Sequence, residues 1–350
     1  MKIRPIVEQL VAFIHHNFLV LLISAYCLAA VFPTFGLWLR SMNFGEVHWH
    51  SAGSVKISLS LLMLSFLLIN AGLGVKTQEL SGLRQRPLPI IFGFAGNMLV
   101  PIFLVFCLQG AMQCWHNNEE VQNLLVGLAV IIAMPIAGSS TAWSQNANGN
   151  LSLSLGLVLL STLFSPLTTP LIMNVFGHMT AGDYSTNLHK IAMQGSDSFM
   201  LLSVVLPSII GIVAGVLLGA ERLKTSRPYL KLANFVVLLL LNYSNASTAL
   251  PQALGAHDWD FLALIYGTTA LMCAAAFGTG WLIAKFLKAD SSERASLMFG
   301  LGMNNNGTGL VLANSTLAMH PATLLPMIFY TLVQQVFAAV VDKKIFRNVS

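Results

Sequence analysis

The sequence predicts an all-α membrane protein in which ten transmembrane helices form two inverted five-helix repeats. Three observations predict it: an apolar composition, ten apolar runs of spanning length, and a one-sided distribution of basic residues. Hydrophobic residues make up 55% of the chain and charged residues only 9%, and the mean hydropathy is +0.73. A soluble domain carries roughly 25% charged residues. The composition therefore excludes a soluble globular protein.

Ten segments are long and apolar enough to cross a bilayer as helices, which takes about 20 predominantly apolar residues. They are residues 18–35, 57–75, 88–109, 122–142, 151–176, 199–219, 232–251, 261–284, 295–316 and 322–341. A polar connection at residues 178–198 separates the fifth span from the sixth. Residues 1–178 and 186–350 then form two repeats of five spans each. Because five is odd, such repeats insert with opposite orientations, an arrangement common in secondary transporters.

Basic residues are concentrated on one side of the predicted membrane. If both termini are cytoplasmic, the inner segments hold 15 of the 18 basic residues, and only Arg40, Lys56 and Lys190 lie outside. This bias follows the positive-inside rule. The sequence thus predicts a protein of the cell (inner) membrane with cytoplasmic termini. The net charge of +5 belongs to the inner membrane edge, so we expect the lipid bilayer and no nucleic acid as a partner.

The fourth span is interrupted by the polar stretch AGSSTAWSQN, residues 137–146. Pro135 removes a backbone donor and Gly138 relaxes the restriction on the backbone dihedral angles. The helix should therefore end near Ile136 and restart around residues 139–140. Unpaired amides and the positive end of a helix dipole would then lie at the bilayer centre, which favours an anion.

The ninth span is interrupted at the corresponding position of the second half, by GLGMNNNGTG at residues 300–309. Irregular polar backbone at membrane depth is tolerated only where it is buried in protein or lines a water-filled cavity. Paired interruptions of this kind are the best sequence pointer to a transporter's binding site. We therefore expect helices 4 and 9 to be broken and to cross at mid-membrane. The alternative is that these polar residues only hydrogen-bond neighbouring helices.

The residues around these breaks resemble the bile acid:sodium symporter family. The run PIAGSSTAWSQNANGNLSLSLGLVLLSTLFSPLTTP, residues 135–170, is similar to that family's broken fourth helix and its fifth helix. The run GMNNNG at residues 302–307 is similar to its broken ninth helix. The resemblance implies a panel domain of spans 1, 2, 6 and 7 and a core domain of spans 3–5 and 8–10. It also implies transport of organic anions by alternating access.

The resemblance implies two groups of site residues. Substrate contacts are expected at Gly138, Ser139, Asn305, Asn306 and Gln334, with Asn242 and Asn245 of the seventh span lining the substrate path. For this last pair, burial in contacts between helices is an equal alternative. The expected sodium ligands are Ser140, Thr141, Ser154, Asn304, Met303 and Asn97. Asn304 stands where the family has a glutamine, and Asn97 is adjacent to Gly96, where the family has another.

The chain departs from the family at two ligand positions. Gly300 stands where the family has a glutamate shared by both sodium sites, and Val158 stands where it usually has a threonine. All 13 acidic residues of this chain fall in loops or at span ends. A dry site without a formal negative charge should bind sodium less well. Weak coupling, no coupling, and a site completed by backbone oxygens all remain open.

The sequence predicts a secondary transporter of a small organic anion. No Lys or Arg falls in mid-span, so helix N-termini, amides and hydroxyls would hold the substrate, which suits a small carboxylate better than a polyanion. The alternative is a non-transporting sensor or an uncoupled facilitator of the same fold. No glycine-rich phosphate loop or nucleophile elbow is present. We therefore expect no enzyme, no catalytic residue and no organic cofactor, and Na⁺ is the candidate coupling ion.

Overall fold

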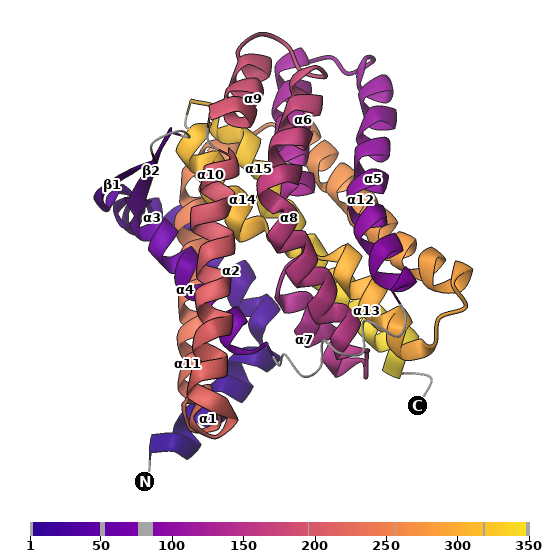
Figure 1. The fold of residues 1–350 in the computed structure, drawn as a ribbon. Coiled ribbons are helices and arrows are strands. Elements are labelled where there is room, and N and C mark those ends of the chain that lie inside the picture. Colours follow the sequence, from indigo (N-terminus) through magenta and orange to yellow (C-terminus); the bar gives the residue numbers. More distant parts are fainter. Residues whose placement is uncertain are drawn as a thin grey trace. The chain divides into compact units, whose positions relative to one another are not determined.

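The computed structural model describes residues 3–49, 53–75, 87–194, 196–255, 257–317 and 319–347. Within these ranges the chain is almost entirely helical, with one two-stranded antiparallel sheet (Figure 1). Four basic residues that support the expected orientation, Lys2, Lys76, Arg84 and Arg86, lie outside the described residues. The chain divides into two compact units, one of residues 1–75 and 198–257 and the other of residues 76–197 and 258–350.

The first unit is built around one long helix, α11, against which α1, α2, α3 and α4 pack. Its elements are α1 (Ile3–His16), α2 (Phe18–Val31), α3 (Pro33–Ser41), β1 (Asn43–Trp49), β2 (Gly53–Ser58), α4 (Leu59–Leu73), η2 (Leu201–Val205) and α11 (Leu206–Gly255). The short helix α10 (Ser196–Met200) precedes η2. The hairpin of β1 and β2 was not predicted from the sequence.

Helix α11 joins two spans that we expected a loop to separate. The helix is interrupted only at Gly219, where φ is 74° and ψ is 163°, a conformation essentially restricted to glycine. Residues 220–231 are helical instead of forming the expected loop. A second glycine, Gly211, lets the backbones of α4 and α11 approach closely, because a β-carbon there would overlap the carbonyl of Ile69.

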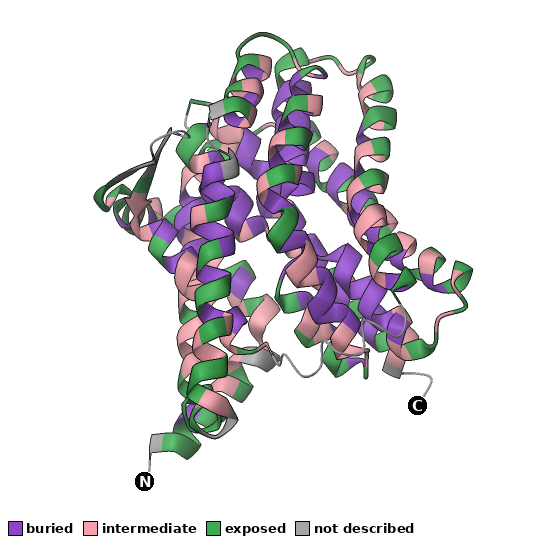
Figure 2. Ribbon diagram, viewed as in Figure 1, coloured by how far each residue is buried: buried purple, intermediate pink, exposed green. Residues whose placement is uncertain are grey.

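The second unit contains both interrupted spans. Its elements are α5 (Leu88–Met112), α6 (Asn118–Ala133), α7 (Ser139–Asn146), α8 (Leu151–Gly177), α9 (Gly182–Gln194), α12 (Trp259–Phe286), α13 (Ser291–Gly302), α14 (Asn306–Thr316), η3 (Pro321–Leu324), α15 (Leu325–Val341) and η4 (Asp342–Arg347). Helix α6 is buried from Glu120 to its end, and α13 is buried from Ala295 to its end (Figure 2). The best-buried helices of this unit are thus those that lead into the breaks.

Five helices of the described chain are individually long and apolar enough to cross a membrane. They are Leu88–Met112, Leu151–Gly177, Ser198–Gly219, Trp259–Phe286 and Pro321–Phe346. The protein is therefore an integral membrane protein. The remaining predicted spans correspond to shorter or divided helices: α2, α4, the second part of α11, and the pairs α6 with α7 and α13 with α14. The count of ten spans stays a prediction.

The polar connection after the fifth span contains helix α9, which packs on α8 and α6. The backbone amide of Ala181 donates to Oε1 of Gln122 at 2.8 Å, and the Tyr184 hydroxyl donates to Oδ1 of Asn123 at 3.2 Å. These bonds attach the connection to the first turns of α6. A segment that looked like a simple linker is thus a packed part of the second unit.

Candidate binding site at two helix breaks

The fourth apolar segment consists of two helices joined by an irregular link. Helix α6 ends at Ala133 and α7 begins at Ser139. The first helix ends three residues before Ile136, where the sequence placed its end. The reason is steric: Met134 precedes Pro135, and a residue before proline is pushed out of the helical region. Met134 is indeed extended, with φ −80° and ψ 142°.

The ninth apolar segment is broken in the same way. Helix α13 ends at Gly302, and α14 begins at Asn306. Gly302 lies so close to the ring of Phe277 that a β-carbon would overlap it. Asn305 is the N-cap of α14, since its Oδ1 accepts from the backbone amide of Thr308 at 3.3 Å. Local side-chain chemistry, the asparagine cap, thus sets the start of α14, and the extended backbone of Met303 ends α13.

The two links pair with each other through their backbones. They form an isolated antiparallel bridge centred on Ile136 and Asn304. Two backbone bonds of 2.9 Å make this bridge, from Ala137 N to Met303 O and from Asn305 N to Pro135 O. Broken helices leave backbone groups without intrahelical partners, and a membrane interior offers no water to satisfy them. The bridge satisfies four of these groups and holds the two breaks together.

Gln334 of α15 supports the second break. Its Oε1 accepts from the backbone amide of Asn304 at 3.1 Å and from Nδ2 of Asn306 at 3.4 Å. Nδ2 of Asn304 in turn donates to the carbonyl of Ile131 at 3.0 Å, near the C-terminal end of α6. The side-chain oxygen of Gln334 is therefore already occupied by hydrogen bonds from the second break. The substrate contact predicted for Gln334 would have to come from its amide nitrogen.

Helix α8 supports the first break. Oγ of Ser161 accepts from the backbone amide of Ile136 at 3.0 Å, and Oγ1 of Thr169 donates to the carbonyl of Ala133 at 2.8 Å. Neither residue was predicted from the sequence to belong to the site. Their spacing was an available signal, because Ser154, Ser161 and Thr169 recur after seven and eight residues and so share one helix face.

We expect Thr169→Val to lower the free energy of unfolding by about 1 kcal/mol. The substitution keeps the shape of the side chain but leaves the buried carbonyl of Ala133 without its donor. The measurement is thermal unfolding of the purified protein in a neutral detergent. Thr162→Val is the matched control, because Thr162 is also a buried threonine of α8. Equal losses in both variants would mean that this bond does not support the break.

Four buried side-chain oxygens at the breaks have no hydrogen-bond partner among the described residues. They are Oγ of Ser140, Oδ1 of Asn304, Oδ1 of Asn306 and Oγ1 of Thr308. A buried polar atom without a partner costs about 1–3 kcal/mol, so native proteins contain few of them. Amide and hydroxyl oxygens are ligands that hard cations accept. These four atoms are of the chemical type that a partly dehydrated cation binds.

Two more predicted sodium ligands contact each other, and one of them, Thr141, follows Ser140 in α7. Oγ of Ser154 on α8 donates to Oγ1 of Thr141 on α7 at 3.2 Å. The contact brings together two residues that are 13 positions apart in the sequence. Their hydroxyl oxygens and that of Ser140 come from the first turns of two neighbouring helices. The first break therefore contributes three hydroxyl groups to its surroundings.

The last two predicted ligands are placed differently. The backbone oxygen of Met303 already accepts from Ala137 in the bridge. Asn97 is buried on α5. The adjacent Gly96 faces α12 and the end of α13, since a β-carbon on it would lie 2.8 Å from Cδ1 of Ile283 and 3.4 Å from Cδ2 of Leu301. Asn97 is thus carried by a helix that packs beside the end of α13.

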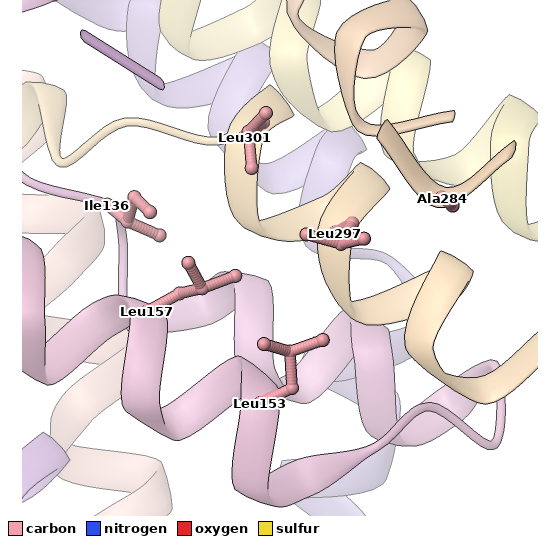
Figure 3. Close-up of a cluster of buried hydrophobic side chains, with 6 residues drawn as sticks. All are labelled: Ile136, Leu153, Leu157, Ala284, Leu297 and Leu301. Carbon is pink, nitrogen blue, oxygen red and sulfur yellow. The ribbon is translucent and has the colours of Figure 1, made fainter. Parts of the chain in front are cut away.

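An apolar cluster occupies the region where the chain departs from the resembled family. Its buried members are Ile136, Leu153, Leu157, Ala284, Leu297 and Leu301. Figure 3 shows the leucines of α8 facing those of α13, with Ile136 near Leu157 and Ala284 of α12 beyond Leu297. Val158 packs against this cluster. A β-carbon on Gly300 would lie 3.0 Å from Cδ1 of Leu157. Hydrocarbon therefore stands where the resemblance would place a carboxylate and a hydroxyl.

The predicted site residues at the breaks differ in solvent exposure, but exposure does not divide substrate contacts from ion ligands, since Asn306 and Gln334 are buried. Gly138 and Ser139, at the start of α7, are exposed, and Asn305 is half-buried. Ser140 is fully buried. Asn306, also predicted as a substrate contact, is buried on the enclosed side together with the partnerless oxygens. Each break therefore has one accessible side and one enclosed side.

Asn242 and Asn245 belong to the first unit and not to the breaks. Oδ1 of Asn242 accepts from the Tyr26 hydroxyl at 3.0 Å, and its Nδ2 donates to the carbonyl of Leu238 at 2.8 Å. Asn245 is 1% exposed. The hydrogen bonds of Asn242 agree with the alternative stated above, in which these asparagines make polar contacts within packed helices. A role of this pair in the substrate path stays a prediction.

Comparison with known proteins gives consistent matches. "Uncharacterized protein YbaS" of Bacillus subtilis (strain 168) is 24% identical over 286 residues, covering 79% of this chain and 85% of that protein. "Uncharacterized sodium-dependent transporter YocS" of the same organism is 22% identical over 285 residues, covering 81% and 82%. The "P3 protein" of Bos taurus is 23% identical over 270 residues, covering 73% of this chain and 51% of that protein.

The family model described as "Sodium Bile acid symporter family" matches residues 61–253. The match covers more than half of the chain and includes the first break, the whole of α8 and nearly all of α11. The protein therefore belongs to the sodium bile acid symporter family and is a membrane transport protein.

Proposed function

We propose that this protein is a secondary transporter that carries a small carboxylate by alternating access and is coupled to sodium at a site of neutral oxygens. The observation that carries the proposal is the antiparallel bridge of Ile136 and Asn304, together with four buried oxygens at the breaks that have no partner in the described part of the chain. Antiparallel pairing of the two breaks is what inverted repeats at residues 1–178 and 186–350 would produce. We further propose ten spans with both termini on the cytoplasmic side.

The two compact units support a division into a panel and a core. One unit holds the first, second, sixth and seventh apolar segments, and the other holds the remaining six. In this proposal the core carries both the ion and the substrate at its breaks. Transporters of this general design work largely by rigid-body movement of one bundle against the other.

The carboxylate would bind on the accessible side of the breaks. The start of α7 offers backbone amides and the positive end of a helix dipole, which together attract anions. Gly138 and Ser139 are exposed there. Because Oδ1 of Asn305 caps α14, its amide nitrogen is the group that can donate to a carboxylate. Such donors suit a single carboxylate.

Sodium would bind on the enclosed side. The partnerless oxygens of Ser140, Asn304, Asn306 and Thr308 supply neutral ligands. The C-terminal ends of α6 and α13 meet at the breaks, and their dipoles favour positive charge. The printed name of the relative YocS includes sodium dependence. Without a carboxylate at position 300, we expect weaker sodium binding than a charged site would give.

Uptake into proteoliposomes tests the proposal. Purified protein is reconstituted, and uptake of 2-oxo acids, a pantoate-like acid and bile acids is followed with an inward sodium gradient or with choline in its place. We expect saturable uptake of a small carboxylate that sodium stimulates. Saturable uptake without a sodium response would instead favour an uncoupled facilitator. The apolar cluster beside Gly300 is the observation that supports this second candidate. If none of these acids shows saturable uptake, the transporter proposal fails and a non-transporting sensor is favoured.

Asn305 gives a sharper test of the substrate side. We expect both Asn305→Leu and Asn305→Ser to weaken binding of the transported carboxylate at least about tenfold, because both lose the amide donor to a charged group. Serine still caps a helix whereas leucine does not. Only the leucine variant should therefore lose stability, by about 1 kcal/mol. Binding is measured as substrate-induced thermal stabilisation. Wild-type affinity in both variants would remove Asn305 from the site.

A further inference from the structure

The first unit contains a cavity of about 150 Å³ between its N-terminal helix and α11. It is lined by Glu8, Val11, Arg227, Pro228 and Lys231. Helices α1 and α11 pack against each other within this unit. The lining residues of α11 directly precede residue 232, where the seventh apolar segment begins. The cavity thus lies next to the membrane end of that segment.

Helix α1 has the surface of a helix that lies in a membrane interface. Ile6, Leu10 and Phe13 are 62%, 43% and 60% exposed, while Val7 is buried. The spacing of four and three residues places the exposed apolar side chains in one stripe. Helix α1 meets α2 at a bend of 75°. An apolar stripe on a helix turned away from a spanning helix is typical of burial at the boundary of headgroups and acyl chains.

Positive charge exceeds negative charge at the cavity. Glu8 is the one carboxylate among the described residues that line it, and Glu8 pairs with Arg4 at 2.9 Å. Arg227 and Lys231 therefore face the cavity as an excess of two cations. The helical turns around the cavity also carry net positive charge, since residues 221–231 contain four basic residues and one acidic residue.

We propose that this cavity binds the phosphate-bearing headgroup of an anionic membrane lipid, with Arg227 and Lys231 holding the phosphate. Basic residues beside a transmembrane helix attract anionic lipids, and the apolar stripe of α1 would contact the acyl chains. The bound lipid would tie α1 to α11. Its assignment to the inner leaflet rests on the proposed orientation of the termini. The inference that the headgroup is anionic rests only on the residues that line the cavity.

The test uses the full chain in neutral detergent, titrated with phosphatidylglycerol, with phosphatidylcholine or with inorganic phosphate. Native mass spectrometry counts bound lipid, and thermal unfolding reports stabilisation. The variant R227Q/K231Q removes both cations, and V11W fills the cavity without changing its charge. R222Q/K224Q is the matched control, because it removes the same charge from the same helix but leaves the cavity lining intact. Thermal unfolding without added lipid checks that each variant is folded.

We expect phosphatidylglycerol to bind the wild type and phosphatidylcholine not to compete with it. R227Q/K231Q should weaken phosphatidylglycerol binding roughly 30-fold, the combined effect of two basic residues at an anionic surface. V11W should abolish binding, and R222Q/K224Q should stay within about threefold of the wild type. An equal loss in both double variants would overturn the proposal in favour of a diffuse charge effect. Equal stabilisation by inorganic phosphate would overturn the assignment to a lipid.

Discussion

The substitution Gly300→Glu is expected to make the stability of this protein strongly dependent on sodium. The new carboxylate would lie in a buried position beside Leu157. An uncompensated buried charge costs roughly 3–5 kcal/mol, so the variant should unfold far more easily in sodium-free buffer. Sodium binding next to the carboxylate should reverse the loss. Each tenfold rise in sodium concentration above the dissociation constant then restores about 1.4 kcal/mol.

Gly300→Gln is the control for this experiment. It has nearly the same shape and separates the effect of volume from that of charge, since either side chain must displace the end of Leu157 by a few tenths of an ångström. The measurement is thermal unfolding at pH 8 in sodium chloride and in choline chloride. If the Glu and Gln variants respond to sodium equally, position 300 does not face a cation site, and the alignment with the family is wrong there.

Asn304→Leu is expected to abolish sodium-stimulated uptake and to lower the free energy of unfolding by about 1–3 kcal/mol. The asparagine has two functions at the bridge. Its Nδ2 donates to the carbonyl of Ile131 at 3.0 Å, and its Oδ1 is one of the partnerless oxygens. Leucine removes both, so a buried carbonyl loses its donor and the proposed ion site loses a ligand. Uptake assays in sodium and in choline, with thermal unfolding, measure the two effects separately.

Two further variants make the Asn304 result specific. Asn123→Leu removes another buried amide near the opposite end of α6, where Oδ1 accepts from Tyr184. It should reduce stability without changing the ratio of uptake in sodium to uptake in choline. Asn304→Gln keeps the amide and should retain part of the sodium response. A sodium response that survives in Asn304→Leu would contradict a cation site at the bridge.

The breaks themselves could be predicted because their causes are local. Pro135 forces Met134 out of the helical region, and Gly302 and Asn305 end one helix and cap the next. The exact end of α6 was misplaced by three residues, since the steric effect of a proline acts on the residue before it. The residues that brace the breaks were missed for a different reason. The spacing of Ser154, Ser161 and Thr169 places them on one face of α8, but it does not reveal that Ser161 accepts from the backbone amide of Ile136.

Connections between segments were predicted less well than the segments. Residues 220–231 carry the charge of a loop but are helical, and the non-helical backbone inside α11 is at Gly219. The hairpin of β1 and β2 and the packed helix α9 were likewise not foreseen. For α9, contacts with distant residues, such as that of Tyr184 with Asn123, stabilise a structure that local preferences leave open.

The sequence by itself determined that this protein is apolar enough to be embedded in a membrane, that two of its segments are broken, and which family it resembles. These properties depend on composition and on residues within a few positions of one another. Only the tertiary structure decided that the breaks pair through Ile136 and Asn304 and that the side chain of Leu157, part of an apolar cluster, lies beside Gly300. The physical reason is that a backbone bridge and a packed cluster join residues far apart in the chain, and the partners are fixed only when the helices pack.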